Sequence, residues 1–141
     1  MKAPGSVILI LAGILWLGCL TATGFADILS ERGVAVAEHF TATVDSGDFQ
    51  AAYWQGSVLL QRSADEQEWI RDMTRLRDLL GPVEQRSLRA IRSVATFPHL
   101  PDGDYLILHY DARTIYKEKA AEVILIVRQN NIWSVCAYSI R

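Results

Sequence analysis

Three residues near the end of the chain have the types and spacing of a catalytic group. Tyr105, His109 and Asp111 occupy odd-numbered positions of one predicted strand, so their side chains leave the same face. Two residues of strand rise bring the His109 and Asp111 side chains to roughly 7 Å apart. His109 could then act as a general base that Asp111 orients, while Tyr105 or Tyr138 donates to a developing oxyanion.

The same side chains also suit a structural role. His109 and Asp111 could face solvent or form cross-strand pairs, because opposite charges on neighbouring strands stabilise a sheet. Glu122 and Arg128 invite the same interpretation. The sequence contains neither a Gly-x-Ser-x-Gly elbow nor a glycine-rich phosphate loop. We therefore favour a protein without catalytic activity, and an enzyme that uses His109 and Asp111 is the alternative.

The histidines do not favour a metal centre. His39, His99 and His109 are separated by long gaps, without the Cys-x-x-Cys or His-Glu-x-x-His spacing of common zinc sites. No metal and no cofactor is therefore expected.

Aromatic side chains offer a different kind of site. Large aromatic rings dominate apolar burial, so most of them are expected in the core. As the lining of a pocket, they could instead bind a small apolar ligand or a protein partner. The candidate binding residues are Tyr53, Trp54, Trp133 and Tyr138.

The C-terminal third of the chain predicts an antiparallel sheet. Asn130-Asn131 suits a two-residue hairpin turn, and Pro101 with Gly103 suits another reversal. The extended runs that these turns separate are expected at 83–97, 105–116, 120–129 and 132–141.

Both faces of these runs carry apolar residues. Strict alternation divides the last run into Trp133, Val135 and Ala137 on one face and Ile132, Ser134, Cys136, Tyr138 and Ile140 on the other. A sheet that is apolar on both faces is covered on both for much of its length. We expect the N-terminal half to cover one face, and a ligand or partner to cover part of the rest.

The chain between the leader and the sheet predicts helices. Ser63-Ala64-Asp65-Glu66 is expected to be a capping box, in which Ser63 accepts at the helix start and Glu66 reaches back. The helix that follows carries an apolar stripe from Trp69 to Leu80 and ends at Gly81-Pro82. Two earlier helices are expected at 28–44 and directly after Asp48.

This order of elements predicts one α+β domain over residues 27–141, with N-terminal helices packed on an antiparallel sheet of about four strands. The length of 141 residues agrees with a single domain. A formal charge of −2 provides no basic surface for nucleic acid, so no nucleic-acid partner is expected.

Residues 1–26 predict export. Lys2 is the only charged residue before Asp27, and an apolar run follows it, as in a secretory signal peptide with a processing site at Gly24-Phe25-Ala26. An uncleaved membrane anchor over 3–26 is a second interpretation, because this run exceeds the roughly 20 residues that span a bilayer. A lipoprotein modified at Cys19 is a third. Each interpretation places the domain in the periplasm or another space outside the cytoplasm.

Short motifs throughout the mature domain resemble a known family. They are Asp45-Ser46-Gly47-Asp48-Phe49, Tyr53-Trp54, Trp69, Gly81-Pro82, Arg86, residues 100–105, Tyr110, Glu122, Trp133 and residues 138–141. On these residues the chain resembles the small exported bacterial proteins grouped as domain of unknown function 4019. Ala137 stands where that family commonly has glycine. The resemblance implies a cystatin-like cone similar to nuclear transport factor 2, in which a curved antiparallel sheet wraps against helices. It implies no activity.

These patterns predict an exported, non-catalytic envelope domain that binds a small apolar ligand or an envelope protein. One alternative is a membrane-anchored accessory subunit of a membrane protein complex. The other is the enzyme of the cone fold that uses His109 and Asp111. Because exposed sheet faces of such cones often pair, the resemblance also admits a homodimer.

Overall fold

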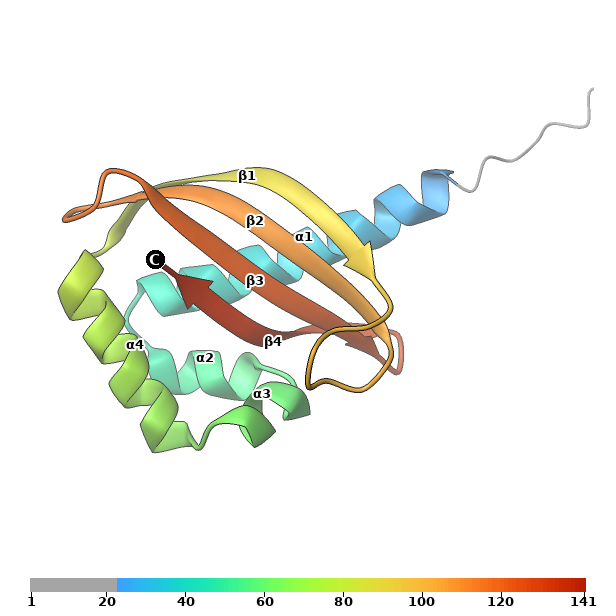
Figure 1. Cartoon of the computed structure of the whole chain (residues 1–141), viewed down its shortest axis with the longest axis horizontal. Helices are drawn as coiled ribbons and strands as arrows, with labels where there is room; N and C mark the ends of the chain where they lie inside the picture. Colours follow the sequence, from blue (N-terminus) through green and yellow to red (C-terminus); the bar gives the residue numbers. More distant parts are fainter. Residues whose placement is uncertain (1–22) are drawn as a thin grey trace, which may run out of the picture.

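The computed structural model describes residues 23–141, so the predicted leader up to residue 22, including Cys19, lies outside the described residues. Helices come first and a curved antiparallel sheet follows, which confirms the predicted α+β class (Figure 1). The helices are α1 (Thr23–Asp45), α2 (Phe49–Gln55), α3 (Val58–Ser63) and α4 (Glu66–Leu80). The strands are β1 (Val83–Val94), β2 (Asp104–Thr114), β3 (Ala120–Gln129) and β4 (Ile132–Ile140).

The four strands pair in chain order, each antiparallel to the next. Asn130 and Asn131 have φ angles of 51° and 61°, as a two-residue turn with the right twist for a hairpin requires, so the predicted turn is confirmed. Helix α1 lies across one face of the sheet, which we call the inner face, while α2, α3 and α4 follow the β4 side (Figure 1).

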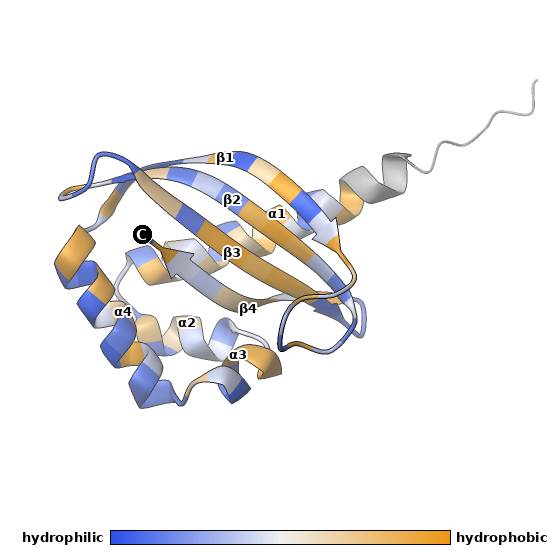
Figure 2. Ribbon diagram, viewed as in Figure 1, coloured by the Kyte–Doolittle hydropathy of each residue, from blue (hydrophilic) through white to orange (hydrophobic). Residues whose placement is uncertain are grey.

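The main core lies between the helices and the inner face. Trp69 and Met73 of α4 are buried, so the predicted apolar stripe does face the sheet. The hydrophobic centre of β2 and β3 supplies the opposite side of this core (Figure 2). Among the described residues, the members of the core clusters lie between Val34 and Ile140, so we expect residues 27–141 to fold without the leader.

Gly33 lets α1 approach the sheet closely. A Cβ atom at this position would lie 2.6 Å from Cδ1 of Ile126 and 2.7 Å from Cδ1 of Leu106. Glycine costs helix stability by about 1 kcal/mol relative to alanine. Here it lets the helix backbone sit directly on two buried side chains, which explains a glycine inside a predicted helix.

The other face of the sheet, the outer face, is covered only at one end. There, Tyr105 and Leu125 form a second buried cluster with Leu59 of α3. The loop between β1 and β2 folds over this end and adds Phe97 and Leu100 (Figure 1). The remainder of the outer face has no covering element among the described residues.

The predicted capping box at Ser63 is wrong. The N-cap of α4 is Asp65, whose carboxylate accepts from the backbone N–H of Glu68 at 2.8 Å. Ser63 is instead the last residue of α3, and its hydroxyl donates to the carbonyl of Leu60 at 2.7 Å. The reason is the short helix α3, capped by Ser57, which occupies a stretch that the sequence pattern left unassigned.

Strict alternation along the last strand is also wrong. Leu125 pairs with Ala137, whereas the next residue of β3, Ile126, pairs with Val135. Cys136 is therefore the extra residue of a β-bulge, which exchanges the faces of the residues that follow it. As a result Ala137 lies on the outer face, and Tyr138 joins the inner-face core.

Candidate functional site

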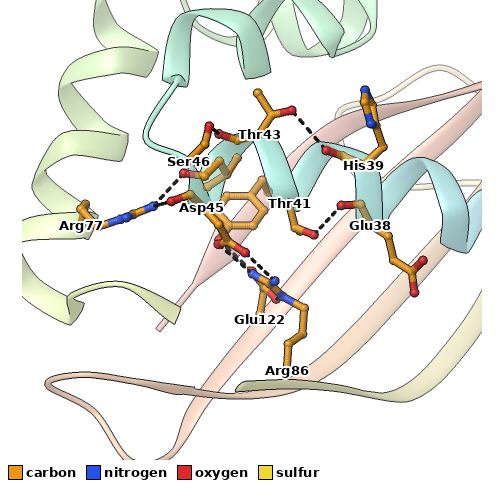
Figure 3. Close-up of polar contacts among 11 residues, drawn as sticks. Glu38, His39, Thr41, Thr43, Asp45, Ser46, Arg77, Arg86 and Glu122 are labelled. Atoms are coloured by element: carbon orange, nitrogen blue, oxygen red, sulfur yellow. Dashed lines mark hydrogen bonds and ion pairs between the residues drawn. The ribbon is translucent and has the colours of Figure 1, made fainter. Parts of the chain in front are cut away.

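A buried charged cluster occupies the inner face near the C-terminal end of α1 (Figure 3). At its centre, the guanidinium of Arg86 forms a bidentate ion pair with the carboxylate of Glu122. Nη2 donates to Oε1 at 2.9 Å, and Nε donates to Oε2. The same guanidinium donates to both oxygens of Asp45, at 2.8 Å and 3.2 Å. The hydroxyl of Tyr138 donates to Oε1 of Glu122 at 2.8 Å. Glu122 has an exposed fraction of 0%, so its charge depends on these partners.

Strand register explains how side chains from separate strands meet in the cluster. Arg86 of β1 lies opposite Ala112 of β2, and Glu122 of β3 lies opposite Tyr110. Arg86 must therefore cross β2 to reach Glu122. A small residue at Ala112 leaves room for the guanidinium to do so.

Helix α4 completes the surroundings of the cluster. Nη2 of Arg77 donates to the carbonyl oxygens of Val44 and Asp45, at 2.7 Å and 3.1 Å. These carbonyls end α1, where a cation also interacts favourably with the helix dipole. Arg86 of β1 thus links the C-terminal end of α1 to the sheet, and Arg77 links it to α4.

Burial and charge set the protonation states in the cluster. Burial alone lowers the pKa of Arg86, but its bonds to Glu122 and Asp45 outweigh that effect and raise the pKa. Burial, reinforced by the charge of Glu122, raises the pKa of Tyr138. Burial and the charges of Glu38 and Glu122 raise the pKa of Tyr110 to about 12. Neither tyrosine is therefore matched to proton transfer near neutral pH.

The cluster was not predicted as a site, although its residues contributed to the family resemblance. One signal in the sequence could have found it. Glu122 shares a strand face with Ile124 and Ile126, and a carboxylate among buried apolar residues needs a cationic partner. That partner is Arg86, not a residue on the adjacent strand, whereas Arg128 does pair across strands with Asp104.

The inner face has no room for a ligand at this position. A cavity between α1, α4 and the sheet, lined in part by Asp45 and Arg77, measures about 20 Å³. That volume accommodates about one water molecule. Aromatic rings fill the neighbouring space, since the Phe40 ring centroid lies 6.2 Å from that of Trp69 and 5.8 Å from that of Tyr138.

The four predicted binding aromatics do not line one pocket. Tyr53 is buried, and its hydroxyl donates to the carbonyl of Ala64 at 3.0 Å. Tyr138 belongs to the charged cluster, and Trp133 packs against the core beneath the guanidinium of Arg128. Trp54, expected in the core or in a pocket, has an exposed fraction of 61%.

The predicted catalytic residues are divided between the two faces. His109 and Asp111 share the outer face, as alternation predicts, and Asp111 lies 3.7 Å from the guanidinium of Arg89. The hydroxyl of Tyr105 is buried and donates to the carbonyl of Pro101. Tyr138 places its hydroxyl on the inner face, on the opposite side of the sheet from His109.

The outer face contains an open hollow of about 310 Å³, which we call the outer hollow. Its floor is apolar, because Ile107, Val123 and Leu125 from adjacent strands all line it. Arg92 and His109 add polar groups at its β1 side. Small-molecule sites combine an apolar lining with a few polar groups in this way, and the volume lies at the lower end of their usual range of roughly 300–1,000 Å³.

Within residues 23–141, no three side chains of the His, Cys, Asp and Glu types are close enough together to hold a metal ion. No helix in the described part of the chain combines the length and hydrophobicity needed to cross a bilayer.

Comparison with known proteins supplies a family. A family model described as "Protein of unknown function (DUF4019)" matches residues 36–138, which confirms the predicted resemblance. No curated protein matches the sequence. The matched residues include all those of the charged cluster and, except for Ser139, all those that line the outer hollow.

Proposed function

Because the chain belongs to the DUF4019 family, whose description assigns no activity, we propose a function from the surface of the domain: it is an exported, non-catalytic envelope domain that binds a small apolar ligand on its outer face. The outer hollow carries this proposal. On its floor, Ile107 and Val123 are partly exposed to water, and a ligand that covers them gains the free energy of removing that surface from water. A protein partner is the alternative occupant.

Several observations support the absence of catalysis. The charged groups of the inner-face cluster, Arg86, Asp45 and Glu122, are paired with one another, and Glu122 has no access to solvent. On the outer face the hydroxyl of Tyr105 is already bound to a carbonyl, and Asp111 has Arg89 as its ion-pair partner. The enzyme that uses His109 and Asp111 would need a substrate that reorganises these contacts.

The cone similar to nuclear transport factor 2 is part of this proposal. A curved sheet with its helices on one face supports it. In such a cone an interior ligand would compete with the rings of Phe40, Trp69 and Tyr138, which already fill the space. The outer hollow is therefore a better place for a ligand than this filled interior.

Val123→Gln tests the proposed site. Residues 27–141 are expected to gain thermal stability from at least one apolar compound in a panel of fatty acids, alkanols and aromatic alcohols. At a ligand concentration of 100 times Kd the gain is about 2.7 kcal/mol. A polar amide on the floor of the outer hollow should abolish most of that gain, because Val123 is one of the apolar residues that line it. Differential scanning fluorimetry measures both effects.

Ile132→Gln is the matched control, because Ile132 is exposed and does not line the outer hollow. This variant should retain the full response to the ligand. If no compound in the panel stabilises the wild-type domain, or if Val123→Gln responds as strongly as Ile132→Gln does, the proposed site is wrong.

A membrane-anchored accessory subunit is a second candidate, which the course of α1 supports. The N-terminal part of α1 runs past the sheet at the end of the molecule away from α4 (Figure 1). A preceding anchor would therefore hold the domain by one end and leave the outer face open. The mass of the protein isolated from cells decides this: a chain that begins at Asp27 rules out the anchor, and a chain that retains residues 3–26 supports it.

A further inference from the structure

The outer hollow has a positively charged side, and the inference drawn from it rests on the proposed function given above. Five arginines lie on the strands, and four of them have a carboxylate within 4.0 Å. Arg86 pairs with Glu122, Arg89 with Asp111, Arg113 with Glu84 and Arg128 with Asp104. Arg92 is the fifth, and no carboxylate among the described residues lies within that distance of it. It is also the arginine that lines the outer hollow.

His109 provides a second polar group beside Arg92. Arg92 of β1 lies opposite Ile107 of β2, while Ala90 lies opposite His109. Arg92 and His109 are therefore diagonal neighbours on one face, and such neighbours are roughly 7–8 Å apart, within reach of long side chains. Both line the outer hollow, so an arginine fork and an imidazole can approach the same ligand group.

The opposite side of the outer hollow is apolar. From Arg92 the floor continues through Ile107 on β2 and Leu125 on β3 to Ala137 on β4, each opposite the next in the strand register. Three strand spacings separate β1 from β4, which is roughly 14 Å. An alkyl chain of medium length can lie across these side chains in an extended conformation.

We infer that the outer hollow binds an amphiphilic monocarboxylate, with the carboxylate on Arg92 and the alkyl chain across Ile107, Val123 and Leu125. A guanidinium binds a carboxylate through two parallel hydrogen bonds and remains charged at every physiological pH. Because the strand carboxylates pair with other arginines, none of them competes for Arg92. A ligand that covers the apolar floor also shields this ion pair from water and strengthens it.

Decanoate and decanol distinguish this inference from the proposed function. Binding to residues 27–141 is measured by isothermal titration calorimetry, with decanoate below its critical micelle concentration and decanol below its solubility limit. Decanoate is expected to bind the wild-type domain, and Arg92→Gln to weaken it at least about tenfold, since hydrogen bonds between charged groups are the strong ones. Decanol should bind more weakly, and Arg92→Gln should leave its affinity unchanged.

Arg113→Gln is the matched control, because Arg113 lies on the sheet but does not line the outer hollow. It should bind decanoate as the wild type does. If decanol binds as tightly as decanoate and Arg92→Gln changes neither affinity, the inferred preference for an anionic head group is wrong, while the proposed binding site stands. If neither compound binds and the wider panel also fails, the proposed function fails as well.

A second copy of the chain is the other occupant to test. Light scattering after size-exclusion chromatography gives the mass of the domain in solution. A dimer that Val123→Gln converts to a monomer would show that another protomer covers the outer hollow, which overturns the inference. A monomer whose Arg92, His109 and Val123 backbone resonances shift on addition of decanoate supports it.

Discussion

Arg86→Leu is expected to lower the free energy of unfolding by about 3–5 kcal/mol, because it leaves a buried charge without its partner. Glu122 is fully buried, and Arg86 donates to both of its carboxylate oxygens. Without the guanidinium, only the hydroxyl of Tyr138 remains bonded to that carboxylate. Asp45 also loses its link to the sheet, and of the two arginines Arg77 alone still bonds the end of α1. Urea unfolding of residues 27–141 at neutral pH measures the change.

Arg113→Leu is the control for this experiment. Arg113 pairs with Glu84 at 3.3 Å, but both side chains are about half exposed, so the expected loss is at most about 1 kcal/mol. The double variant Arg86→Met with Glu122→Leu should recover part of the loss, since apolar residues of similar volume can replace a buried ion pair. If Arg86→Leu costs no more than Arg113→Leu, the cluster does not stabilise the fold as argued.

Local patterns were sufficient to predict much of the fold. Alternation predicted the run at 120–129, and Asn130-Asn131 predicted the turn that follows it, because both signals lie within a few adjacent residues. Asp48 accepts from the N–H of Ala51 at 3.0 Å, as a capping residue should. Gly81 ends α4 with a φ angle of 73°, again as expected from residue type alone.

The candidate site depends on contacts that no local pattern contains. Arg86 lies 36 residues before Glu122 and 41 residues after Asp45 in the sequence. A shift of the strand register by one residue would place Arg86 and Glu122 on opposite faces of the sheet. The outer hollow likewise needs the correct pairing of all four strands, including the bulge at Cys136. Residue types identified several members of both sites, but only the strand register brings them together.

Two tryptophans of the helical region, Trp54 and Trp69, differ in burial although they are the same residue type. Trp54 and Trp69 were both expected among the aromatics of the core. Trp69 has an exposed fraction of 7%, whereas Trp54 lies on the outside of α2 and donates to Oε1 of Glu66 at 3.1 Å. Tertiary packing separates them, because α4 turns the first toward Phe40 while α2 turns the second toward solvent.

Trp69→Ala is expected to lower the free energy of unfolding by about 3–5 kcal/mol, as other buried large-to-alanine changes do. The indole ring lies 6.2 Å from Phe40 and 6.5 Å from Tyr53, centroid to centroid, so its removal leaves a cavity between α1, α2 and α4. Its Nε1 also donates to the carbonyl of Phe49 at 2.9 Å, and this buried hydrogen bond would be lost. Trp54→Ala should cost less than about 1 kcal/mol, because an exposed residue has little packing to lose.

Trp69→Phe separates the two contributions to that loss. Phenylalanine keeps an aromatic ring against Phe40 but cannot donate to the carbonyl of Phe49, so the variant should fall between wild type and Trp69→Ala. Chemical unfolding followed by far-ultraviolet circular dichroism compares all variants without depending on tryptophan fluorescence. Equal losses for Trp54→Ala and Trp69→Ala would contradict the arrangement in which α4 closes the inner face of the sheet. A large loss at Trp69 alone would establish that this ring joins the helices into one core, which the charged cluster then fastens to the sheet.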